Sequence, residues 1–74
     1  KSISSYCFEI SKNDFEKLSV KEKIEILNEF KSTYHIKFFD NSIPLNECIK
    51  LLFDLKIDII DIVNIKSNEH FIYE

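Results

Sequence analysis

Two aspartates, Asp58 and Asp61, lie in a run of residues, KIDIIDIVNIK, that is otherwise largely isoleucine. Carboxylates at this spacing could serve acid–base chemistry or hold a metal ion. A structural role is also open, because a short acid such as Asp58 suits the turn that follows a helix. In a regular strand Asp61 shares a face with Val63 and Ile65. We therefore expect either a strand that begins after Asp61, which is then exposed at an edge, or a partly buried Asp61 carboxylate with a partner, and we favour the first.

Four further side chains, Cys7, His35, Cys48 and His70, are of types that bind zinc or form a cysteine–histidine nucleophilic pair. Small zinc modules draw their ligands from close pairs, about two to five residues apart, and no such pair occurs here. Both cysteines lie in apolar stretches, where a free thiol behaves as a small hydrophobe. The chain also has no glycine from which to build a phosphate-binding loop. We expect two buried free thiols, no metal, no cofactor and no enzymatic activity.

The composition indicates one small domain and an AT-rich genome. A chain of 74 residues has room for a single domain, residues 1–74, and the lack of an initiating Met suggests that it was excised from a longer protein. Ile, Lys, Asn and Phe are abundant, whereas Gly, Ala, Arg, Met, Trp and Gln are absent. The codons of the abundant residues are AT-rich, which suggests an AT-rich genome such as that of a low-GC bacterium, its mobile elements, a large DNA virus or a eukaryotic parasite.

Charge argues against nucleic acid as the partner. The net charge is −3, with seven Lys and six acids in residues 1–38 but three Lys and seven acids in residues 39–74. Nucleic-acid binders usually have a basic patch, and Arg, which reads guanine and phosphate with two parallel bonds, is missing here. No apolar run approaches the ~20 residues that cross a bilayer. We expect a cytoplasmic protein, in the host cell if viral, with no membrane contact.

Periodicity predicts five elements along the chain. Ser5 to Ile10 alternates like a strand. SVKE, Ser19 to Glu22, has the spacing of a capping box and predicts a helix that ends near Thr33 to His35. Pro44 to Leu55 predicts a second, largely apolar helix, and the tail predicts a hairpin around SNEH. Positions with positive φ must use Asn where Gly is missing, and Asn41 and Asn68 are the candidates.

The order strand-helix-helix-strand-strand predicts an α+β fold with a three-stranded sheet and two helices on one face. A winged-helix-like fold is the alternative, because two helices followed by a hairpin form part of it. A DNA-reading helix should be basic, however, and the second predicted helix offers only Lys50 beside Glu47 and Asp54. If the fold is winged-helix-like, we expect a protein-binding variant.

Phe38 and Phe39 are adjacent in a short extended segment, so their side chains point to opposite sides and one enters the core more easily than the other. An exposed aromatic beside Tyr34 and Ile43 would be a partner-binding anchor, although packing under the connecting segment is equally open. The protein-binding candidates are Tyr34, Phe38, Phe39, Ile43 and Asp61.

These observations favour a small intracellular module, regulatory or inhibitory, that binds another protein or further domains of its own chain. A homodimer formed through a sheet edge is open, because no edge proline or glycine bulge is available to block pairing. The first alternative is a nucleic-acid-binding, winged-helix-like domain. The second is part of an enzyme that uses carboxylates, in which Asp58 and Asp61 would be essential.

Overall fold

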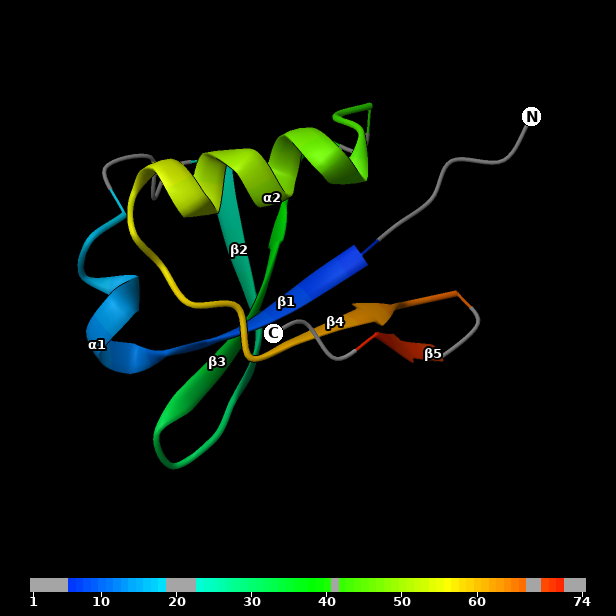
Figure 1. The fold of residues 1–74 in the computed structure, drawn as a ribbon. Coiled ribbons are helices and arrows are strands. Elements are labelled where there is room, and N and C mark those ends of the chain that lie inside the picture. Colours follow the sequence, from blue (N-terminus) through cyan, green and yellow to red (C-terminus); the bar gives the residue numbers. More distant parts are fainter. Residues whose placement is uncertain (1–5, 19–22, 41, 67–68, 72–74) are drawn as a thin grey trace.

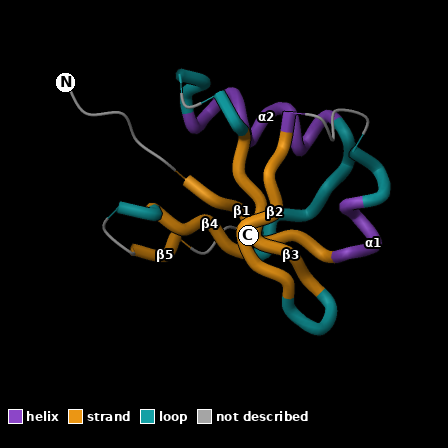
Figure 2. The backbone as a smooth tube through the Cα atoms, turned by 180° about the vertical axis from the view of Figure 1, so that it is seen from behind, coloured by secondary structure: helices purple, strands orange, loops and turns teal. Residues whose placement is uncertain are grey.

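The computed structural model describes residues 6–18, 23–40, 42–66 and 69–71. These residues form one five-stranded antiparallel sheet in the order β2-β3-β1-β4-β5, with a helix lying across it (Figures 1 and 2). The strands are β1 (Tyr6–Ser11), β2 (Ile24–Glu29), β3 (Thr33–Phe38), β4 (Asp61–Asn64) and β5 (Glu69–Phe71), and the helices are α1 (Lys12–Phe15) and α2 (Leu45–Asp54). The predicted α+β class is confirmed, with five strands in place of three.

The largest correction concerns the first predicted helix. Its capping box, Ser19 to Glu22, lies outside the described residues, but the segment after it forms the β2–β3 hairpin, closed by a bond from the Phe30 N–H to the Thr33 carbonyl at 2.9 Å. Among the described residues only α2, with ten residues, is longer than about one helical turn. The other helix, α1, has four residues and follows directly on β1. The helix predicted after Ser19 is therefore wrong, although the described residues do include two helices, and the order of helices and strands does not match the winged-helix-like alternative.

The edge strand β2 is bulged. Its register against β3 shifts between Ile26 and Asn28, so Leu27 has no partner in the ladder. A bulge bends an edge strand and disturbs the row of amides and carbonyls that a second strand would need. The chain forms this bulge without a glycine. Because of the bulge, the β2 edge is less suited to pairing with another copy of the chain than the sequence indicated.

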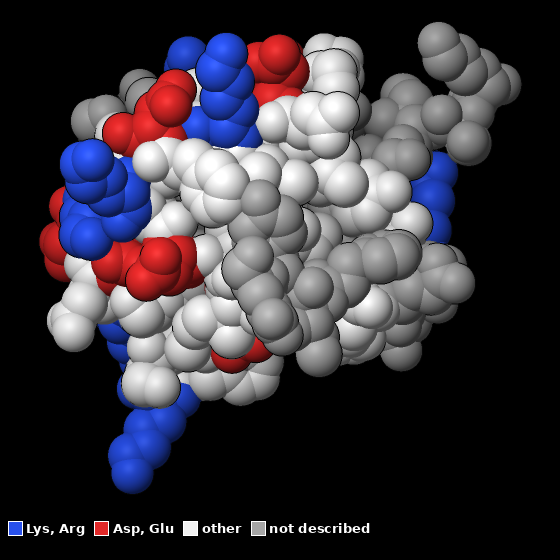
Figure 3. Space-filling view, viewed as in Figure 1, with Lys and Arg blue, Asp and Glu red and all other residues white. Residues whose placement is uncertain are grey.

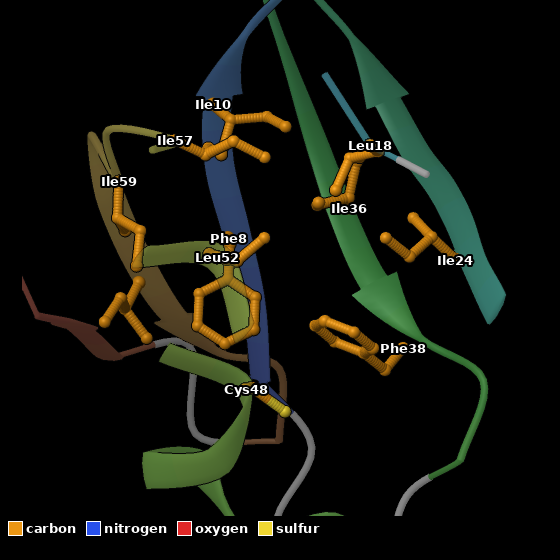
Figure 4. Close-up of a cluster of buried hydrophobic side chains, with 11 residues drawn as sticks. Phe8, Ile10, Leu18, Ile24, Ile36, Phe38, Cys48, Leu52, Ile57 and Ile59 are labelled. Atoms are coloured by element: carbon orange, nitrogen blue, oxygen red, sulfur yellow. The ribbon is translucent and has the colours of Figure 1, made fainter. Parts of the chain in front are cut away.

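The core lies between α2 and the face of the sheet that carries Phe8, Ile36 and Phe38. The rings of Phe8 and Phe38 meet edge to face, with centroids 6.3 Å apart (Figure 4). Leu52 comes down from α2 onto this layer and is fully buried. Burying such side chains stabilises the fold by about 1.5–3 kcal/mol each. The buried cluster comprises Phe8, Ile10, Leu18, Ile24, Ile36, Phe38, Cys48, Leu52, Ile57, Ile59 and Ile62.

The α2 helix ends with a residue in the left-handed region. Lys56 has a φ of 61°, and the Ile57 N–H donates to the Leu52 carbonyl at 3.0 Å, the long bond of a Schellman motif. Leu52 and Ile57 are both fully buried, which is the hydrophobic contact that accompanies this motif. Asn41 and Asn68, the positions predicted for positive φ, lie outside the described residues.

A short acid joins α1 to the segment between α2 and β4. The Asp14 carboxylate accepts the Asp58 backbone N–H at 3.0 Å and pairs with the Lys17 ammonium at 2.9 Å. Both contacts lower the pKa of Asp14 below its usual range, the Lys17 bond most. The Lys17 ammonium also donates to the Lys56 carbonyl at 3.0 Å. Polar contacts at Lys56 and Asp58 therefore attach this part of the chain to α1 and to the residues just after it.

Candidate functional site

Asp61 opens β4 and lies inside the sheet, directly opposite Glu9 of β1. One of its carboxylate oxygens accepts the Ile62 N–H at 2.8 Å, and the other lies 2.7 Å from Nδ1 of His70. The Asp61 side chain is 17% exposed. The alternative that we favoured, a strand beginning after an exposed Asp61, is wrong: Asp61 is the partly buried, paired carboxylate.

The Glu9 carboxylate also has partners, and both come from β3, on the side of β1 away from Asp61. Its carboxylate accepts the Thr33 hydroxyl at 2.7 Å and lies 3.5 Å from Nε2 of His35, its cross-strand neighbour on β3. Two carboxylates directly opposite each other repel, so Glu9 and Asp61 need these outer partners. The result is a polar row of His35, Glu9, Asp61 and His70 across the face of the sheet turned away from α2.

Cys7 shares that face but is not activated as a nucleophile. The side chain is 4% exposed, and its pKa is raised by burial first and then by the charges of Asp61 and Glu9. Cys48 lies on α2, on the other side of the sheet, and burial is also the main cause of its raised pKa. Both thiols are free and buried, which confirms the prediction made for them.

The polar row can orient an imidazole but shows no metal centre. Asp61 fixes the ring of His70, whose side chain is 52% exposed, and within the described residues no partner contacts its Nε2. Among those residues no three His, Cys, Asp or Glu side chains are grouped so as to hold a metal ion. Asp58 is not part of the row, because its N–H is bound to Asp14 beside α1. The two aspartates of KIDIIDIVNIK therefore do not act as a pair.

The second feature is an open pocket of about 300 Å³ between the β2–β3 hairpin and the start of α2. The Phe39 N–H donates to the Lys23 carbonyl at 3.0 Å, which extends the hairpin by one residue pair and brings Lys23 beside the connection to α2. We call this feature the Phe39 pocket, and it is lined by Lys23, Phe38, Phe39, Asp40 and Ile43.

The two phenylalanines divide as predicted from their adjacency. Phe38 is 5% exposed and belongs to the core, whereas Phe39 is 56% exposed, the highest value among the exposed large apolar residues of the described chain. Ile43 is half-buried against the core. The pocket therefore has a fixed apolar floor and one exposed aromatic side chain beside it.

The structure brings together three of the five candidate residues. Phe38, Phe39 and Ile43 line the pocket, whereas Tyr34 lies near the opposite end of β3, with its ring 4.9 Å from that of Phe15 and 5.2 Å from the Lys12 ammonium. Asp61 belongs to the polar row. Lys23 and Asp40 were not predicted, because Lys23 falls inside the wrongly predicted helix and no spacing in the sequence singles out Asp40.

Charges are mixed over the surface. On the face shown in Figure 3, acidic and basic side chains lie next to one another around α1 and the end of α2, while the described residues that can be seen nearer the middle are largely uncharged. The Asp14–Lys17 pair belongs to α1 and the residues just after it. Acidic and basic side chains are therefore interspersed on this face and do not form one acidic patch.

Comparison with protein-family models, curated proteins and solved structures found no match. No helix in the described part of the chain is long and apolar enough to span a membrane.

Proposed function

We propose that this chain is a small protein-interaction module, of regulatory or inhibitory type, whose contact site is the Phe39 pocket. The observation that supports it most is an exposed aromatic side chain beside an apolar pocket with charges at its rim. Interfaces have this arrangement, in which a few buried apolar anchors are surrounded by polar groups. The partner in this proposal is either a second protein or another part of a longer chain. We also expect a cytoplasmic location.

The size of the pocket fits a side chain better than a cofactor. Its volume of about 300 Å³ is at the lower limit of the ~300–1,000 Å³ usual for small-molecule sites. The Asp40 carboxylate accepts the Ser42 N–H at 2.9 Å and the Ser42 hydroxyl at 2.6 Å. The direction of this lining side chain is therefore set before a partner binds, which limits the entropy that it loses on binding.

The test uses peptides selected from a random library on the wild-type protein. Phe39→Ala should weaken binding of the selected peptides at least tenfold, because central aromatic anchors cost more than about 2 kcal/mol when truncated. Phe30→Ala is the matched control, since Phe30 is 46% exposed and lies at the other end of the hairpin. Calorimetry on both variants gives the comparison. Equal binding by Phe39→Ala and wild type, or an equal loss in both variants, would overturn the proposal.

The polar row supports the enzymatic alternative less well. Asp61 orients His70 as a carboxylate orients a general base. The nearby thiol of Cys7 is buried, and the raised pKa keeps it protonated. We therefore assign the row to stabilising the sheet and propose no reaction for it.

A further inference from the structure

The Phe39 pocket carries one negative and one positive charge. Hydrogen bonds from the hydroxyl and the N–H of Ser42 lower the pKa of the Asp40 carboxyl, which keeps Asp40 ionised at neutral pH. Because Ser42 is neutral, these bonds set the direction of the carboxylate and leave its charge in place. Both bonds reach the same oxygen, Oδ1, and within the described residues the other oxygen, Oδ2, has no hydrogen bond or ion pair.

Lys23 supplies the positive charge. Its carbonyl accepts the Phe39 N–H at 3.0 Å, so the residue is held at the pocket, while its side chain is exposed. In the described part of the chain its ammonium makes no hydrogen bond or ion pair, and it is therefore not paired with Asp40. A lysine stem can cover apolar surface while its charged end stays in water. The pocket thus combines an apolar floor with two opposite charges that are not joined in an ion pair.

This pair of charges restricts the chemistry of an occupant. An uncharged occupant would displace water from both charged groups and replace none of the lost hydration. An occupant with a single charge would pair with one of the two residues and face a like charge on the other. An occupant that carries an acid and a base offers a partner to each of them.

We propose that the segment that fills the Phe39 pocket carries both an acidic and a basic side chain beside its apolar anchor, the acid pairing with the Lys23 ammonium and the base with the Asp40 carboxylate. The inference rests on the proposed function and specifies the chemistry of its partner. The net charge of the whole chain, −3, would favour a purely basic occupant. At physiological salt, however, charges beyond about 8 Å are largely screened, so the two charges of the pocket decide.

Five short peptides can test the inference. They are tripeptides with Phe in the middle and blocked ends, flanked by Glu and Lys in either order, by two Glu, by two Lys or by two Gln. Each is titrated at 0.15 M salt into the ¹⁵N-labelled protein, and dissociation constants are taken from the amide shifts of residues 38–40 and 42–43. We expect the tighter of the two mixed peptides to bind about two- to fivefold more tightly than the other three compositions, as for partly exposed ion pairs.

Two variants assign that preference to its source. Lys23→Gln keeps the backbone bond to Phe39 but leaves Asp40 as the charged residue of the pocket, so the peptide with two Lys should bind at least as tightly as the mixed ones. Asp40→Asn should have the opposite effect and favour the peptide with two Glu. The net charge of the chain cannot produce both changes, because it stays negative in both variants and favours Lys throughout.

Lys31→Gln and Asp54→Asn are the matched controls. They change the net charge in the same two ways, but Lys31 lies in the turn at the other end of the hairpin and Asp54 is the last residue of α2. Both side chains are exposed. Neither variant should alter the order of the five peptides.

The outcomes separate the inference from the proposed function. If the peptide with two Gln binds the wild type as tightly as the mixed ones, or the peptide with two Lys binds it most tightly, while Phe39→Ala weakens all five, the pocket is a binding site and only the mixed charge of the partner is wrong. An order that neither Lys23→Gln nor Asp40→Asn alters would also overturn the inference. If no peptide shifts the amides around the pocket, the proposed function itself fails. Spectra of each variant without peptide report whether its fold is intact.

Discussion

Lys56 takes a conformation that costs an L-residue about 1–2 kcal/mol, because Cβ approaches the following carbonyl oxygen. Replacing it with glycine removes this cost but adds about 0.5–1 kcal/mol of entropy to the unfolded chain. Lys56→Gly should therefore stabilise the fold by about 0.5–1 kcal/mol, measured as the free energy of unfolding in urea. Lys50→Gly, inside α2, should destabilise it by about 1 kcal/mol. Destabilisation by Lys56→Gly would contradict the assigned φ.

The contact between Asp61 and His70 connects β4 to the edge strand β5. Removing it with Asp61→Asn or His70→Gln should lower the free energy of unfolding by about 0.5–1.5 kcal/mol, as expected for a hydrogen bond to a charged group that is half open to solvent. A double-mutant cycle isolates the pair, and we expect a coupling energy of at least about 0.5 kcal/mol. Glu47→Gln, on the exposed side of α2, is the control for loss of an acid. A coupling energy near zero would show that the contact does not hold β5.

At the level of single residues, the sequence predicted burial better than pairing. Alternation showed that only one of Phe38 and Phe39 would enter the core, and the apolar surroundings of Cys7 and Cys48 indicated buried thiols. The partner of Asp61 could not be predicted, because His70 reaches it only after the β4–β5 hairpin has folded back. The two residues are only nine positions apart, but their separation in the sequence does not by itself predict that their side chains meet.

The α2 helix is stabilised by one buried side, and two adjacent leucines test this. Leu52 is fully buried, whereas Leu51 is 41% exposed. Leu52→Ala should destabilise the fold by about 2–5 kcal/mol, a large part of the stability of so small a domain, because it leaves a cavity under the helix. Leu51→Ala should change the free energy of unfolding by less than about 1 kcal/mol. Similar losses in both variants, measured by chemical unfolding, would mean that α2 is turned differently on the sheet.

At the level of elements, some segments were predictable and one was not. The first strand, the second helix and the C-terminal hairpin lie close to their predicted positions, because each has one dominant period or a strong boundary such as Pro44. The β2–β3 segment fits both periods, since Ile24 and Leu27 suit a helix while Ile24 and Ile26 suit a strand. Pairing with the distant β1 decides between them. The connecting turn at residues 30–32 also has no Gly, Asn or Pro to mark it.

For the molecule as a whole, Asp14 predicts a dependence of stability on pH. Its pKa is lowered in the folded state by Lys17 and by the Asp58 N–H, so its contribution is present above the ordinary pKa of about 3.9 and is lost as the pH falls through the lower, folded value. Asp14→Asn should be less stable than wild type near pH 7 by about 0.5–1 kcal/mol, since the Lys17 partner is 49% exposed.

That difference should shrink as urea titrations are repeated from pH 5 down to pH 2.5. The matched control is Asp54→Asn, the same change at an exposed position of α2. A gap between Asp14→Asn and wild type that stays constant down to pH 2.5 would contradict an ionic role for Asp14.

The sheet order divides the chain at a single point. The strands β2, β3 and β1 form one side of the sheet, and β4 and β5 form the other, so the connection at residues 39–44 separates two halves that meet along the β1–β4 ladder and beneath α2 (Figure 2). Two peptides cut within this connection should therefore reassemble without a covalent link. Mixing them should restore a cooperative thermal transition whose midpoint rises with peptide concentration. If each half were fused to a different protein, refolding of the two halves would then report that the two proteins are close together.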